Sequence, residues 1–149
     1  MGPSLTHLAV HHFPVVLALA GATAFLVGFV SRRAPAQQYG ALSLLLAGAT
    51  APAAYLSGRW AAAELASRSA GVDARATLGS VLEAHALYGT LATLALIAAG
   101  VTAAVWLRRA GRRLGVALVA LAVFAALLSM AAGWKGGFIL HGGLPVAGR

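Results

Sequence analysis

Long apolar runs separated by short polar stretches dominate this chain. About 20 consecutive apolar residues are enough for a helix to cross the hydrocarbon core of a bilayer. Four runs of this kind occur, at residues 13–30, 41–56, 84–107 and 114–133. A longer polar connection, residues 58–83, joins the second run to the third. The pattern predicts an all-α fold, an integral membrane four-helix bundle that forms one domain over residues 1–149.

Composition agrees with this prediction. Of the 149 residues, 60% are hydrophobic and 9% are charged, and the mean hydropathy is +0.86. A soluble domain carries about 25% charged residues, so most of this chain is not built to face water. The absence of cysteine excludes a disulfide framework, thiolate ligands, an iron–sulfur cluster and covalent attachment of a c-type haem.

Charged residues are divided between the two sides of the predicted membrane. Two short connections hold six arginines and no acid: Arg32, Arg33, Arg108, Arg109, Arg112 and Arg113. All three acids, Glu64, Asp73 and Glu83, lie in the 58–83 connection. Cytoplasmic loops are enriched in Lys and Arg, so both arginine loops are expected on the cytoplasmic side of a bacterial inner membrane. Both termini and the 58–83 loop are then expected on the outer (periplasmic) side, and the net charge of +8 indicates topology rather than nucleic-acid binding.

Tryptophans stand at the ends of the predicted spans. Trp60 and Trp134 lie at the outer ends of the second and fourth spans, and Trp106 lies at the inner end of the third. Tryptophan is enriched where a bilayer meets water, so we interpret all three as interfacial anchors. In the 58–83 connection, Trp60 and Leu65 are interleaved with Arg and Glu, which predicts a short amphipathic helix on the outer surface.

Small residues recur along all four predicted helices. Helices in lipid associate by close packing, and Gly or Ala at the contact lets two backbones approach. We therefore interpret Gly21, Gly28 and Gly48 as packing positions rather than functional ones.

All five histidines fall at the outer end of the predicted spans: His7, His11, His12, His85 and His141. Polar rings near apolar surface are costly unless they are paired, so this cluster predicts a ligand site. His7 and His11 are four residues apart and share a helix face, whereas His12 lies about 100° further round. His12 stands where the apolar run begins. We expect His12 and His85 to be the first pair of ligands, with His7 and His141 next.

Neutral imidazoles that converge between helices can bind haem iron from both sides, or hold Zn or Cu. The small residues Gly89 and Ala92 would leave room for a haem, and Arg59 could pair with its propionates. Haem b is therefore the expected cofactor. Zn or Cu bound by His12 and His85 is the alternative.

The positions of these histidines also support a family resemblance over nearly the whole chain. The residues that carry it are His7-x4-His12-Phe13-Pro14, His85 at the start of the third span, and Gly136-Gly137 followed by His141-Gly142 and Val146. This pattern resembles a bacterial family of four-helix transmembrane domains of unknown function. The resemblance implies the same topology, and it implies His7, His12, His85 and His141, but not His11, as candidate ligands.

Electron transfer by a b-type haem near the outer membrane face is the function expected from this arrangement. Such a protein would exchange electrons with a quinol, a periplasmic electron carrier or other subunits of a membrane complex. Two alternatives stay open, a structural accessory subunit of a larger membrane complex and a Zn- or Cu-binding membrane protein. A stand-alone hydrolytic enzyme is not indicated, because no serine is paired with a base. An ion transporter is not indicated either, because the spans carry no charge at mid-membrane.

Overall fold

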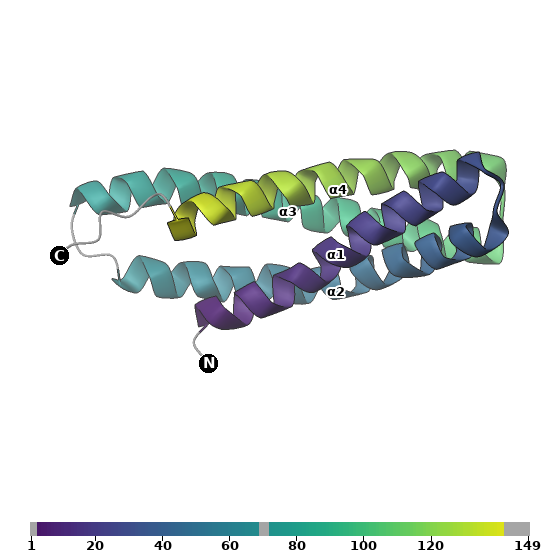
Figure 1. The fold of residues 1–149 in the computed structure, drawn as a ribbon. Coiled ribbons are helices and arrows are strands. Elements are labelled where there is room, and N and C mark those ends of the chain that lie inside the picture. The colour runs from purple at the N-terminus through teal and green to yellow at the C-terminus, as the bar shows by residue number, and fades with distance from the viewer. Residues whose placement is uncertain (1–2, 69–71, 142–149) are drawn as a thin grey trace.

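The computed structural model describes residues 3–68 and 72–141 and folds them into four helices (Figure 1). The helices are α1 (Pro3–Val30), α2 (Ala34–Arg68), α3 (Val72–Arg108) and α4 (Arg112–His141). No strand occurs in these two ranges. The prediction of an all-α, four-helix fold is confirmed.

All four helices are long and apolar enough to cross a membrane. The qualifying segments are Leu5–Val30, Ala34–Leu65, Gly79–Arg108 and Arg112–Gly137. Many large apolar side chains point away from the bundle, among them Val27, Leu94, Val101, Val116 and Leu127. A helix that is apolar on its outer face as well as its inner face needs lipid around it, which fits a multi-pass membrane protein.

Consecutive helices run in opposite directions, so the α1–α2 and α3–α4 connections lie at the same end of the bundle (Figure 1). We call this end, which carries residues 31–33 and 109–111, the Arg end. Helix α1 closes there with Arg32 in the left-handed region, at a φ of 56°, and the Arg33 N–H donates to the Gly28 carbonyl. The opposite half of the bundle contains the start of α1, the end of α4 and the segment where α2 leads to α3.

Residues 58–83 differ from the prediction of a long outer loop. Helix α2 continues to Arg68, and α3 begins at Val72, so every described residue of this connection is helical. The predicted second span ends at residue 56 because the hydrophobicity of the sequence falls there. The backbone continues because the Ala61–Leu65 segment consists of strong helix formers with no proline.

The tightest packing lies near the Arg end. Its core combines alanines with three fully buried large side chains, Phe25, Leu44 and Leu118. Trp106 belongs to this core: it is 7% exposed, and its ring meets that of Phe25 edge-on at 5.0 Å between centroids. The prediction that Trp106 is an interfacial anchor is therefore wrong, because its helix turns the indole towards α1. Trp60 and Trp134 are both exposed.

Glycines allow these helices to approach closely. A Cβ at Gly40 in α2 would collide with the backbone of Phe25 in α1. A Cβ at Gly48 would lie 2.6 Å from the Leu96 carbonyl oxygen of α3 and 3.0 Å from Gly100 Cα. The interpretation of Gly21, Gly28 and Gly48 as packing positions is confirmed. A Cβ at each of these positions would lie 3.0 Å or less from an atom of a neighbouring helix.

Candidate functional site

A cavity of about 350 Å³ opens in the half of the bundle away from the Arg end. This volume lies within the range of about 300–1,000 Å³ that small-molecule sites occupy. All four helices contribute to its wall, which consists mainly of small apolar residues: Ala51, Ala54, Ala62, Ala63, Ala86, Gly89, Ala92 and Ala132. The side chains at these positions are too short to fill the space between the helices, so the cavity is a direct consequence of the Ala- and Gly-rich sequence.

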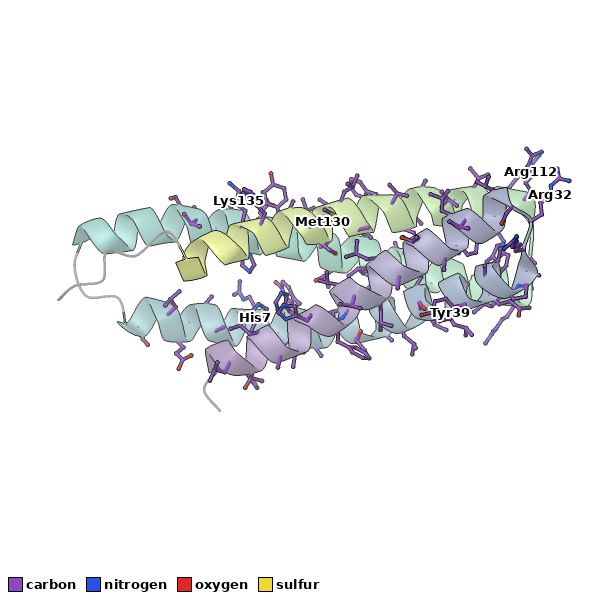
Figure 2. The ribbon with its side chains drawn as sticks, viewed as in Figure 1. His7, Arg32, Tyr39, Arg112, Met130 and Lys135 are labelled. Carbon is purple, nitrogen blue, oxygen red and sulfur yellow. The ribbon has the colours of Figure 1, made fainter. Side chains whose placement is uncertain are left out.

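Three histidines line this cavity, His7 and His11 from α1 and His85 from α3. Figure 2 shows His7 on the side of α1 that faces the other helices. The His7 and His85 rings are 6.4 Å apart between centroids, with their planes at 80°. His11 stacks on His7 at 5.1 Å. Two helix hairpins thus present imidazoles to one apolar space.

His7 is held in place by α2. Its Nδ1 lies 3.0 Å from Ser57 Oγ, and that hydroxyl donates its own proton to the Ala54 carbonyl at 2.8 Å. Ser57 must therefore accept, so His7 Nδ1 carries the hydrogen and Nε2 keeps a free lone pair. The ring also packs against Gly58, where a Cβ would lie 3.0 Å from His7 Cε1.

His85 is held in the same way by α4. Its Nδ1 is 2.9 Å from the Ala132 carbonyl oxygen, which can only accept, so Nδ1 is again the protonated nitrogen. The ring packs against Gly136, where a Cβ would lie 3.0 Å from His85 Cε1. A hydrogen bond from one ring nitrogen to a carbonyl is how proteins orient the other nitrogen of a metal-binding histidine.

The other sequence-predicted ligands are placed differently. His12 is exposed and does not line the cavity, and its Nδ1 pairs with the Leu8 carbonyl of its own helix. His11, which is not one of the predicted ligands, does line the cavity, and its Nδ1 pairs with the His7 carbonyl at 3.3 Å. His141 is the last residue of α4, and its side chain lies outside the described part of the structure, as do Gly142 and Val146 of the family-like motif.

Several lining residues carry polar atoms that sequence reasoning did not assign to a site. These residues are Tyr55, Thr93 and Ser129. The exposed Arg59, which the sequence suggests as a partner for propionates, also lines the cavity. Ser129 Oγ is buried and, among the described residues, is the one buried side-chain polar atom without a hydrogen-bond partner. Nothing in the spacing of these residues marks them, because they meet only when four helices assemble.

The donor set is small for a bare metal ion. Among the side chains that the structure describes, which do not include Asp73 and His141, no group of three His, Asp or Glu is arranged to hold one. Structural and catalytic Zn sites take three or four protein ligands. Haem iron needs at most two, because the macrocycle supplies the other four, and His7 with His85 provides that number.

Comparisons of the chain with protein-family models, with curated proteins and with solved structures find no match. The interpretation of the site therefore rests on the side chains that line it and on their geometry.

Proposed function

We propose that this chain is a membrane electron-transfer protein that holds one b-type haem between His7 and His85. The carrying observation is the pair of imidazoles that face one apolar cavity from separate hairpins, 6.4 Å apart. His7 and His85 are the two residues that would hold the haem iron.

The surroundings of the two rings suit a flat, apolar cofactor with acidic edges. Small residues leave the space for a macrocycle, and the exposed Arg59 on the cavity wall can pair with propionates. Ser57 and the Ala132 carbonyl fix the tautomers that leave both Nε2 atoms free to ligate. When bound, haem supplies an iron centre that gains and loses single electrons. The chain itself orients the two histidines that would hold it.

The location of the site limits the side of the membrane on which electrons are exchanged. The histidines lie in one half of the bundle, and the Arg end carries none. By the charge asymmetry of the loops, the Arg end faces the cytoplasm of a bacterial inner membrane, and the haem lies near the periplasmic face. A single haem at one face exchanges electrons with partners at that face, such as a quinol, a periplasmic carrier or another membrane subunit.

Absorption spectra of the full chain purified from membranes test the proposal. We expect a Soret band, sharpened α and β bands after reduction with dithionite, and one haem per chain. His7→Ala and His85→Ala should each abolish stoichiometric haem, since each removes one of the two side chains that would hold it. His12→Ala is the matched control and should retain the haem, because this side chain lies outside the cavity.

Other results of these experiments would contradict the proposal and favour a different ligand pair or function. Loss of haem in His12→Ala but not in His7→Ala would favour the ligand pair expected from sequence and contradict the site described above. Stoichiometric Zn or Cu without haem would identify a metal-binding protein. A chain with neither cofactor, whose assembly into a larger complex is unaffected by His7→Ala and His85→Ala, would be a structural accessory subunit.

A further inference from the structure

The Arg end concentrates positive charge that the haem site does not use. Six exposed arginines belong to its two turns: Arg32, Arg33, Arg108, Arg109, Arg112 and Arg113. Figure 2 shows Arg32 and Arg112 at this end. The two turns are held together by Phe29 of α1, whose ring occupies the space that a Cβ on Gly115 of α4 would take. Two loops that are distant in sequence thus form one cationic surface.

The acidic side chains of the sequence belong to segments away from that surface. The three acids of the sequence, Glu64, Asp73 and Glu83, all belong to the α2–α3 segment in the other half of the bundle. Helices α2 and α4 both begin at the Arg end, and neither has an acidic residue in its first turn. The partial positive charge of two helix N-termini therefore adds to the charge of the arginines.

Several of these arginines lie at positions where an arginine destabilises the local helix or turn. Arg112 and Arg113 occupy the first turn of α4, and Arg33 directly precedes α2, although a cation at a helix N-terminus is destabilising. Arg32 has a φ of 56°, a region that favours Gly or Asn. Arg108, in the last turn of α3, and Arg109, which directly follows it, have the favourable sign for a helix C-terminus. An anionic partner at this surface would offset the local cost of Arg32, Arg33, Arg112 and Arg113.

We propose that the Arg end binds the phosphate groups of anionic phospholipids in the leaflet that it faces. The partner is a lipid because the surface lies where four membrane-spanning helices end, at the depth of the headgroups. Arginine forks bind phosphate oxygens in pairs, and the first-turn N–H groups of α2 and α4 add further donors. This proposal does not depend on the haem.

Spin-labelled lipids in vesicles of phosphatidylcholine test it with the reconstituted full chain. We expect the chain to immobilise spin-labelled phosphatidylglycerol in preference to spin-labelled phosphatidylcholine. Arg112→Gln and Arg32→Asn should each lower that preference about fivefold, because one arginine near an anionic surface contributes that factor. Asn is accepted at the backbone angles of Arg32, so this variant should fold normally, which circular dichroism can verify.

Lys135→Gln is the matched control, since it removes one exposed cation from the other half of the bundle. It should leave the preference unchanged. The proposal is overturned if the wild-type chain does not distinguish the two lipids, or if Lys135→Gln lowers the preference as much as Arg112→Gln. Displacement of the labelled lipid by an equal concentration of inorganic phosphate would also overturn it, because the surface would then bind soluble phosphate.

Discussion

At the scale of single residues, the site depends on which nitrogen of His7 is protonated. The Ser57 hydroxyl accepts a hydrogen bond from His7 Nδ1 and donates one to the Ala54 carbonyl, so His7 Nε2 is left free. The side chain that orients a metal-binding histidine is worth about 10–100-fold in metal affinity.

Ser57→Ala therefore should weaken haem binding by about 10–100-fold without changing the helix content of the protein. Titration of the haem-free chain with haem measures the dissociation constant, and circular dichroism measures the helix content. Ser57→Thr keeps a hydroxyl at the same position and should bind haem like the wild-type chain. Equal affinity of Ser57→Ala and wild type would mean that His7 is oriented by packing against Gly58 alone.

The sequence indicates that the histidines gather in one half of the bundle, but not which rings line the cavity. His7 and His12 lie on different faces of α1, and the face that turns towards the cavity is set by contacts such as that of His7 with Ser57, which is 50 positions away in sequence. The same is true of Gly58 and Gly136, which are ordinary helix glycines until His7 and His85 are placed against them. Side-chain partners between helices have no local signature.

At the scale of helices, hydrophobicity predicted the number and position of the spans but not where each helix ends. The apolar run of the second span stops near residue 56, yet α2 continues to Arg68. Lipid selects for hydrophobic side chains, whereas backbone hydrogen bonds continue as long as the residues favour a helix. Trp106 was misassigned for a related reason, because its position along the helix was evident and its direction around the helix was not.

Gly40→Ala tests how tightly α1 and α2 are joined. A Cβ at this position would collide with the backbone of Phe25, which cannot move without separating the helices. We expect a loss of roughly 1–3 kcal/mol in the free energy of unfolding, as for other overpacked contacts. Unfolding in mixed micelles with increasing denaturing detergent measures the loss.

Gly79→Ala provides the control for helix propensity, since nothing lies within 4 Å of the position of its Cβ. This variant should be as stable as the wild-type chain or slightly more stable, because Ala favours a helix over Gly. A stable Gly40→Ala protein would show that α1 and α2 can separate at little cost.

At the scale of the whole molecule, the fold separates the arginine turns from the histidines along the bundle axis (Figure 1). The chain contains no cysteine, so single cysteines can report on which side of a membrane each end lies. Ser31 in the first arginine turn and Ser67 near the end of α2 are both exposed and suit this purpose.

Intact cells that express Ser67→Cys should be labelled by a membrane-impermeant maleimide, and cells that express Ser31→Cys should be labelled only after the inner membrane is opened. The reason is the cytoplasmic preference of arginine-rich loops. The reverse pattern would place the histidines at the cytoplasmic face, and labelling of both residues from the same side would contradict a membrane-crossing α2.

Helices α2 and α3 also extend further than α1 and α4 at the end opposite the arginine turns (Figure 1). They contain 35 and 37 residues, a length of more than about 50 Å, whereas the hydrocarbon core of a bilayer is about 30 Å thick. A molecule that approaches the cavity from this end therefore meets α2 and α3 before it meets α1 and α4.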